Sequence, residues 1–384
     1  MTRTSISLHK LLLVAFLIVI LTLVYLPAAG ADALALAQSC GQWSITRSSD
    51  PSTMLSLDGI AAISPQDVWT VGYFINLQGT NQALTERWNG NRWINVPNPD
   101  PGTPRSFLDG VAGDSPTDVW AVGGTAAGNW ENQHTLIEHW NGTDWSLFPS
   151  MPGVLDGVAI LSANNVWAVG GNAGKTLVEQ WNGSQWNVIP SPSPGKYGNS
   201  LNSVTALTPS DVWAVGSYSA TQFGYRSLIE HWNGSRWSVV KSPVLGTYPY
   251  DLRAVSGIAA NDIWAVGDYT TPPGDITLTL AEHWNGKQWS VVPTPSPTGD
   301  DILLGVAAIA TNDVWAVGDY SPGGQNLIEQ WNGTGWNVVS SPFRRSGVSG
   351  LSAVSADSAT DIWAAGIDIN KHNFTYHTLI EHYC

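Results

Sequence analysis

The chain has 384 residues, of which only 12% are charged, and it carries 21 Trp, 39 Gly and 23 Pro. Few charges combined with many aromatic and turn-forming residues argue against intrinsic disorder and favour short strands joined by tight turns. The formal net charge of −14 argues against nucleic acid and anionic membranes as partners, because both attract basic surfaces.

The N-terminal segment is typical of a targeting sequence. Arg3, His9 and Lys10 precede an apolar run of 16 residues, 11–26. Because that run is short for a membrane span, we expect residues 1–37 to be a cleaved signal peptide, with an uncleaved N-terminal anchor as the alternative. A lipid-attachment site at Cys40 is a weaker alternative, since residues 37–39 are a poor lipid-attachment box. In each case the rest of the chain is extracellular or at the cell surface.

Two motifs recur along the remaining sequence. Asp-Val-Trp-Ala-Val-Gly occurs seven times in close variants, at spacings of 46 to 51 residues, and Trp-Asn-Gly-x-x-Trp follows six of them. The tryptophans of the first motif are Trp69, Trp120, Trp167, Trp213, Trp264, Trp315 and Trp363. A period of this length indicates a repeat architecture.

Each repeat unit predicts four short strands. Examples are residues 155–161 for the first, the Asp-Val-Trp motif for the second, 136–140 for the third and 237–240 for the fourth. Asn-Gly between the third and fourth strands favours a type I′ hairpin turn, and the following Ser-Pro stretch ends the unit. We therefore predict an all-β fold in which residues 40–384 form one seven-bladed β-propeller of about 49-residue repeats, with four antiparallel strands per blade.

The two ends of the chain complete one another in the repeat register. The seventh unit stops at Cys384, where its hairpin turn should begin, and the missing fourth strand is found around Trp43. Cys40 and Cys384, the two cysteines of the chain, then occupy turn positions that face each other. We expect the N-terminal strand to complete the last blade and a disulfide to join these cysteines, because an exported protein retains such bonds.

In blade length, hairpin turn and split last blade, residues 40–384 resemble bacterial exported β-propellers. Their general architecture is similar to that of kelch and galactose-oxidase-type propellers. The double glycine typical of kelch repeats is not clearly present, and both cysteines are assigned to ring closure rather than to the Tyr–Cys crosslink of galactose oxidase. The resemblance therefore implies an architecture and little about activity.

Several chemical groups repeat with the blades. The third strand carries Glu in all seven units, followed by His in four. Since seven copies around a ring cannot converge on one substrate, we expect these glutamates to bridge strands or blades by hydrogen bonds. The Asp that opens the second strand is expected to cap a turn. Twenty of the 21 tryptophans lie on the repeat and are expected to pack between blades.

The connections between second and third strands, and between one blade and the next, vary in length and should emerge on the same face. Binding residues usually lie on variable loops of a rigid scaffold. The expected ligand-binding face carries Tyr73, Phe74, Trp130, Asn132, Lys196, Tyr197, Phe223, Tyr225, Arg226, Tyr248, Tyr250, Lys371, His372 and Phe374. Aromatic rings beside polar groups suit a glycan or a protein ligand. The alternative is that these residues merely cover the blade ends.

A second set consists of the second residue of each innermost strand, and these residues are expected to ring the mouth of a central channel. Its members are Asp58, Asp109, Asp156, Asn202, Arg253, Leu304 and Ser352. The three carboxylates could bind Ca²⁺ or perform acid–base chemistry on a polysaccharide, whereas the simpler interpretation is a set of solvated channel charges.

The sequence contains no known catalytic or metal-binding motif, so we assign no catalytic residue, no metal ligand and no cofactor beyond Ca²⁺ as an option. It predicts a monomeric, non-catalytic binding module that recognises a glycan or protein ligand. The alternative is a polysaccharide hydrolase or lyase with an acidic site at the channel mouth.

Overall fold

The computed structural model describes residues 40–52, 54–99, 101–128, 132–222, 224–245, 250–272, 276–320, 324–342 and 347–384. Every regular element in these ranges is a β-strand, which confirms the all-β prediction. Residues 41–384 form one compact unit, whereas the expected signal segment, residues 1–37, lies outside the described residues. No helix of the length and apolar character required to cross a membrane occurs in the described ranges.

The structure describes 28 strands, which occupy four positions, from innermost to outermost, in each repeat. The innermost are β2 (Leu55–Ser64), β6 (Arg105–Ser115), β10 (Val154–Ser162), β14 (Gly198–Thr208), β18 (Tyr250–Ala259), β22 (Asp301–Ala310) and β26 (Gly347–Ser358). The second are β3 (Asp67–Ile75), β7 (Asp118–Ala126), β11 (Asn165–Asn172), β15 (Asp211–Thr221), β19 (Asp262–Thr271), β23 (Asp313–Tyr320) and β27 (Asp361–Asn370). The third are β4 (Asn81–Trp88), β8 (His134–Trp140), β12 (Lys175–Trp181), β16 (Gly224–Trp232), β20 (Ile276–Trp284), β24 (Gln325–Trp331) and β28 (Tyr376–Tyr383). The outermost are β5 (Trp93–Asn95), β9 (Trp145–Leu147), β13 (Trp186–Val188), β17 (Trp237–Val239), β21 (Trp289–Val291), β25 (Trp336–Val338) and β1 (Trp43–Thr46).

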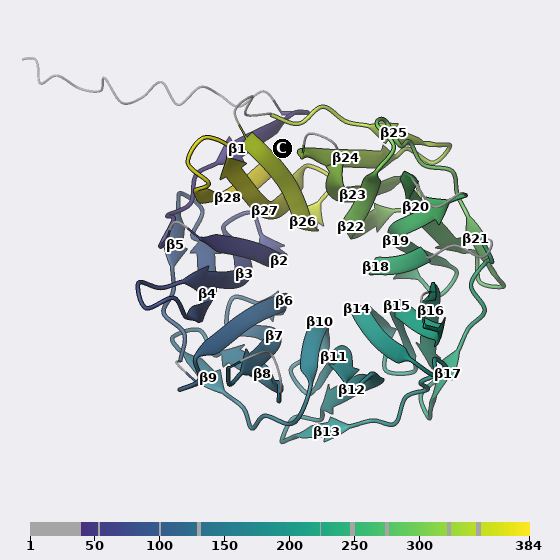
Figure 1. Ribbon diagram of the computed structural model, residues 1–384, viewed down its shortest axis with the longest axis horizontal. Helices are drawn as coiled ribbons and strands as arrows, with labels where there is room; N and C mark the ends of the chain where they lie inside the picture. Colours follow the sequence, from purple (N-terminus) through teal and green to yellow (C-terminus); the bar gives the residue numbers. More distant parts are fainter. Residues whose placement is uncertain are drawn as a thin grey trace, which may run out of the picture. The chain divides into compact units, whose positions relative to one another are not determined.

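These strands pair antiparallel in fours around a common centre (Figure 1). Five sheets have four strands, and one has eight because a single parallel pair, Asn81 with Arg105, joins β2–β5 to β6–β9. We number the groups of four in chain order, from group one (β2–β5) to group seven (β26–β28 with β1). β1 pairs with β28, with Trp43 opposite Tyr383, so the first and last strands of the chain share one sheet.

The second strand is apolar on both faces because each sheet is covered by a neighbouring sheet on both sides. Its closing glycine lies against the innermost strand: a Cβ on Gly267 would lie 2.0 Å from the carbonyl oxygen of Asp251. Only glycine permits that approach. The motif Asp-Val-Trp-Ala-Val-Gly thus encodes a buried strand and its close contact with the centre of the ring.

Tryptophans join each group to the next. The second-strand Trp213 of group four lies 5.0 Å from Trp284 and 5.7 Å from Trp289, the hairpin pair of group five, measured between ring centroids. The same contact connects the last group to the first, where Trp363 packs on Trp88 and Trp93. The prediction that the repeated tryptophans pack between blades is confirmed for the residues that the structure describes.

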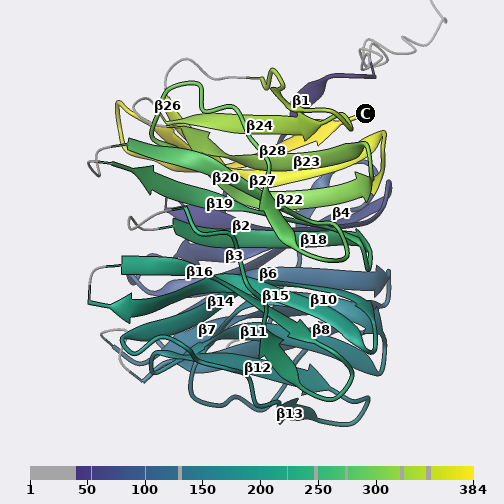
Figure 2. The same cartoon turned by 90° about the vertical axis from the view of Figure 1, so that its right-hand side faces the viewer.

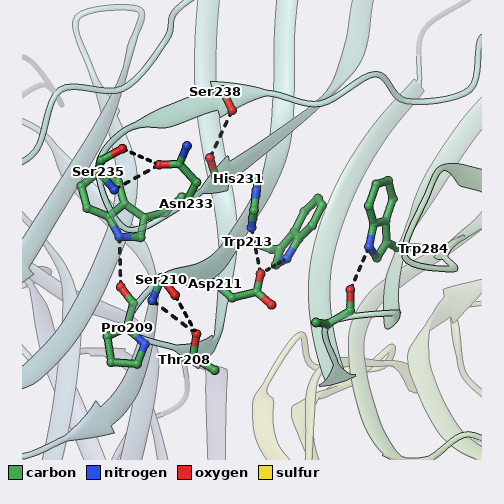
Figure 3. A network of polar contacts seen from close by, with 12 residues as sticks. Thr208, Pro209, Ser210, Asp211, Trp213, His231, Asn233, Ser235, Ser238 and Trp284 are labelled. Carbon is green, nitrogen blue, oxygen red and sulfur yellow. Dashed lines mark hydrogen bonds and ion pairs between the residues drawn. The ribbon is translucent and has the colours of Figure 1, made fainter.

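The aspartate that opens the second strand makes contacts different from those expected. In group four, Trp213 Nε1 donates to Asp211 Oδ1 at 2.8 Å, and His231 Nε2 lies 2.8 Å from the same oxygen (Figure 3). The imidazole of His231 stacks on Trp213 with centroids 4.3 Å apart. The expectation of a turn cap was therefore wrong: this aspartate fixes the third strand and the tryptophan together. Equivalent Asp–His contacts are Asp118–His139, Asp262–His283 and Asp361–His382.

The third-strand glutamates are buried, and five of the seven bridge neighbouring groups. The Ser242 hydroxyl, in the segment that follows group four, donates to Glu282 of group five at 2.9 Å. Ser341 bonds Glu381 in the same way at 2.8 Å. Asn98 donates to Glu138 at 3.2 Å. The serine or asparagine occupies the same repeat position each time, so the bridging expected from the sequence is confirmed for these glutamates but not for Glu179 and Glu329.

Burial strongly favours the neutral form of these glutamates. It raises the pKa of Glu282 to about 8 and that of Glu179 to about 7. Glu179 and Glu329 have no hydrogen-bond partner among the described residues, although Ser150 occupies the repeat position that would reach Glu179. Two interfaces therefore lack a bond that the others possess.

The serine bridge can be tested by removing one hydroxyl. We expect Ser242→Ala to lower the free energy of unfolding by about 1–3 kcal/mol, because the buried Glu282 carboxyl loses its partner. Urea denaturation followed by tryptophan fluorescence measures this change. Ser150→Ala is the matched control, since Ser150 is exposed and makes no such bond; equal losses in both variants would contradict the bridge.

Candidate functional site

The residues expected at the channel mouth occupy one structural position, a β-bulge. In each innermost strand the pairing with the second strand shifts at one residue, as between Leu57 and Gly59 in β2. The residue left unpaired is Asp58 in group one, and its equivalents are Asp109, Asp156, Asn202, Arg253, Leu304 and Ser352. All seven line one central cavity of about 170 Å³. The structure therefore brings this predicted set together.

Three adjacent carboxyl groups occupy one side of this cavity. Burial raises the pKa of Asp58 to about 6, while a hydrogen bond from Ser56 at 2.7 Å lowers it. Burial raises the pKa of Asp156 to about 7. The pKa of Asp109, which lies between them, is raised well above its ordinary value by burial and then by the charges of Asp156 and Asp58. Asp58 and Asp156 can therefore exchange protons near neutral pH.

The other side of the cavity is held by polar bonds within the protein. Asn202 Nδ2 donates to the carbonyl of Leu252 at 2.8 Å. Arg253 lies between Asp251 and Asp268, with nitrogen–oxygen distances of 3.4 and 3.3 Å. Across the described ranges, no three His, Cys, Asp or Glu side chains are placed to hold a metal ion.

The variable connections emerge at one end of the sheets, because the strands run parallel to the central axis and alternate in direction (Figure 2). Two cavities of about 490 Å³ each open there. We name them after one lining residue each. The Asp319 cavity is lined by groups six and seven and by Ser56 of group one, and the Leu77 cavity lies between groups seven and one.

The Leu77 cavity combines exposed apolar residues with a polar contact. Leu77 is fully exposed and Met54 is 44% exposed. Asp50 contacts His377 Nδ1 at 2.7 Å and accepts a bond from the backbone N–H of Thr378 at 2.8 Å. Asp50 thereby fixes the segment that follows β1 onto β28.

The residues expected on the ligand-binding face have mixed accessibility. Tyr197, Tyr225 and Phe374 are 54%, 56% and 75% exposed. Tyr250 is only 5% exposed, and the guanidinium of Arg226 lies 5.2 Å above its ring, so Tyr250 contributes to packing rather than to the surface. Its position in β18 turns the ring inward, which sequence alone did not reveal.

The remaining members of that set are distributed over several loops and strands. Tyr73 and Phe74 are partly buried in β3, and burial followed by the charge of Asp58 raises the pKa of Tyr73. Asn132 precedes β8 with a φ of 56°, and His372 lies between β27 and β28. Trp130, Phe223 and Tyr248 lie outside the described residues.

The Asp319 cavity was not predicted, although the sequence holds a signal for it. Two residues before the bulge, the innermost strands carry Ser56, Phe107, Val154, Ser200, Asp251, Ile302 and Gly350. Only group seven has glycine, and a Cβ at Gly350 would lie 3.1 Å from Asp319 Oδ2. The missing side chain leaves room for the cavity.

The acidic side of the channel predicts how stability depends on pH. The folded-state pKa values of Asp58, Asp109 and Asp156 lie above the unfolded value of about 4, so these groups bind protons on folding. The free energy of unfolding therefore decreases as the pH rises from about 4 through about 7. We expect Asp109→Asn to raise the free energy of unfolding at pH 8 by about 1–2 kcal/mol and to change it less at pH 5.

Chemical denaturation at both pH values measures this effect. The exposed Asp114 supplies the control variant, Asp114→Asn. An identical pH dependence of stability in Asp109→Asn and the unmodified protein would contradict the repulsion between these carboxyls.

Comparison with known proteins identifies the fold of this chain but assigns it to no family. No family model matches the chain, and no curated protein matches it. The solved structure "YCF48 bound to D1 peptide" is similar, with a TM-score of 0.58 at 15% identity, over 89% of this chain and 97% of that one. A PL25 ulvan lyase bound to -[GlcA(1-4)Rha3S]- gives a TM-score of 0.53 at 10% identity, over 81% and 89% of the two chains.

A third similar structure is the GH74 xyloglucanase from Xanthomonas campestris, with a TM-score of 0.55 at 13% identity, over 88% of this chain and 55% of that one. At such identities the likeness concerns the fold alone. Four-stranded antiparallel sheets around a centre, together with these neighbours, show that the chain folds as a β-propeller.

Proposed function

We propose that this protein is a non-catalytic binding module, outside the cell or on its surface, that recognises a protein or glycan ligand through the variable-loop face. The observation that carries the proposal is the pair of cavities of about 490 Å³ on this face. They combine apolar walls with a few polar groups, as binding sites usually do. The opposite ends of the sheets carry short hairpin turns that repeat from group to group.

The neighbouring structures are compatible with both ligand classes. One similar propeller, YCF48, is bound to a D1 peptide, and another, the ulvan lyase, is bound to a GlcA–Rha3S saccharide. Exposed rings such as Tyr225 and Phe374 suit either ligand, because an aromatic face stacks on a sugar or packs against an apolar side chain.

The proposal includes the finer architecture. We infer one propeller of seven blades in residues 40–384, with the last blade shared by β1 and β28, following removal of residues 1–37 as a signal peptide. The Trp363 contacts with Trp88 and Trp93 support a closed ring. The backbone N–H of Gly41, which follows Cys40, donates to the carbonyl of Cys384. The structure contains no disulfide between Cys40 and Cys384, and we propose that one forms during export.

Closure by a disulfide has a direct chemical test. Non-reducing peptide mapping of the secreted protein should yield a single peptide pair linked through Cys40 and Cys384. Replacing both cysteines with serine should lower the stability by up to about 5 kcal/mol, because the bond closes a very long loop. Alkylation of both thiols in the native, unreduced protein would contradict the bond.

The binding proposal is tested by screening the purified protein on glycan and peptide arrays. We expect a specific ligand whose affinity falls at least about tenfold in Tyr225→Ala or Phe374→Ala, since each ring would lose its packing partner. The control is Val188→Ala, which alters an exposed apolar residue on an outermost strand. Unchanged affinity in both aromatic variants, with unchanged melting temperatures, would contradict the proposed face.

A second candidate function, a polysaccharide hydrolase or lyase, is favoured by the three channel carboxyls with raised pKa values. Two carboxyls with different proton affinities can divide the roles of acid and base. The same polysaccharides, incubated with the protein and assayed for released oligosaccharides with and without a chelator, distinguish the candidates. Product release that disappears in Asp109→Asn would support the enzyme, and dependence on Ca²⁺ would assign the ion to this site.

A further inference from the structure

The Asp319 cavity has one apolar wall and one acidic wall. Val348 and Gly350 of β26 pair with Ile369 and Ile367 of β27, so these four residues share one face of the group-seven sheet, and all four line the cavity. Group six contributes Asp319 and Tyr320. The cavity therefore places a carboxylate beside an elongated aliphatic surface.

Asp319 lies in unfavourable surroundings for a carboxylate. It is paired across the sheet with Ile302, and Leu304 also lines the cavity. Burial and then the charge of Asp301 raise the pKa of Asp319. In the part of the chain that the structure describes, no cation forms an ion pair with it. A positively charged group in the cavity would relieve both the desolvation and the repulsion.

In group five, the equivalent aspartate already has a cationic partner within the protein. Asp268 in group five occupies the same repeat position as Asp319, and Arg253 Nε lies 3.3 Å from its Oδ1. Arg253 extends from the bulge position of β18, which is Leu304 in group six. Group five thus supplies its own guanidinium to this aspartate, whereas group six has leucine at the corresponding place.

The dimensions and chemistry of the cavity match a long basic side chain. Arginine and lysine have an aliphatic stem that packs on apolar surfaces and a charged end that requires a carboxylate. The stem would lie along Ile367 and Ile369, and the charged end would reach Asp319. Tyr320 also lines the cavity, and its hydroxyl donates to Gln325 Oε1 at 2.7 Å.

The charge of the protein also agrees with a basic ligand, because a net charge of −14 attracts basic partners. We infer that the Asp319 cavity binds an arginine or lysine side chain of a polypeptide partner. This inference rests on the proposed function and defines the chemistry of its ligand.

The test compares charged and neutral side chains of the same shape. The probes are two pools of acetylated, amidated pentapeptides with arginine or citrulline at the central position and mixed residues elsewhere. Binding to the full-length protein is measured by titration, and the site is located by the methyl NMR signals of Ile367 and Ile369. We expect the arginine pool to bind about tenfold or more tightly than the citrulline pool and to shift both signals.

Three variants address the cavity directly. Asp319→Asn should weaken binding of the arginine pool about tenfold or more, because the charged partner is lost. Gly350→Val should abolish binding by filling the cavity. Leu304→Arg should abolish it by supplying the cation that group five carries as Arg253. Asp114→Asn and Gly335→Ala are matched controls, since both residues lie away from the cavity and a Cβ at Gly335 meets open space.

Equal binding of the two pools, no binding of the arginine pool, or unchanged affinity in Asp319→Asn and Gly350→Val would overturn the inference. Thermal melting of each variant separates lost binding from lost folding, and if Leu304→Arg does not fold, the other two variants decide. A glycan that shifts the Ile367 and Ile369 signals while the arginine pool does not would overturn this inference and leave the proposed binding function intact. Failure of the proposed function is recognised separately, by arrays that yield no ligand for the loop face.

Discussion

The contact between one tryptophan and the tryptophan pair of the next group is the interaction on which the rest of the structure depends. A four-stranded sheet has two faces, and neither is polar enough to remain in water. Trp213 against Trp284 and Trp289 covers one face of two groups at once. Repeated around the ring, this contact leaves the variable connections free to differ, because none of them is needed to keep the sheets in place.

Much of this arrangement could be predicted because each signal was repeated. The Trp spacing, the Asn-Gly turns and the invariant third-strand glutamate each occur in several copies, so their common role outweighed local variation. Repetition also placed Asp58 and its equivalents around one centre. The role of Asp211 was misjudged because its partner, His231, is 20 residues away and becomes adjacent only through strand pairing.

Features that break the repeat were harder to predict. Tyr250 resembles a surface aromatic residue in a loop-rich segment, yet the register of β18 against β19 turns it inward. The Asp319 cavity results from an absent side chain at Gly350 and from the way neighbouring groups approach each other. A single sequence names the residues of each group, whereas the space between groups depends on how their faces fit together.

The pairing of β1 with β28 has a consequence for how the protein is made. Thr46 and Ile380, which are bonded across this pair, lie 334 residues apart, so the sheet they share can be completed only after nearly the whole chain has been synthesised. Until then the hairpin tryptophans of group one have no partner from group seven, and the incomplete chain exposes a large apolar surface. A chaperone that shields aromatic segments during synthesis suits such a topology, since contacts of long sequence separation form late and slowly.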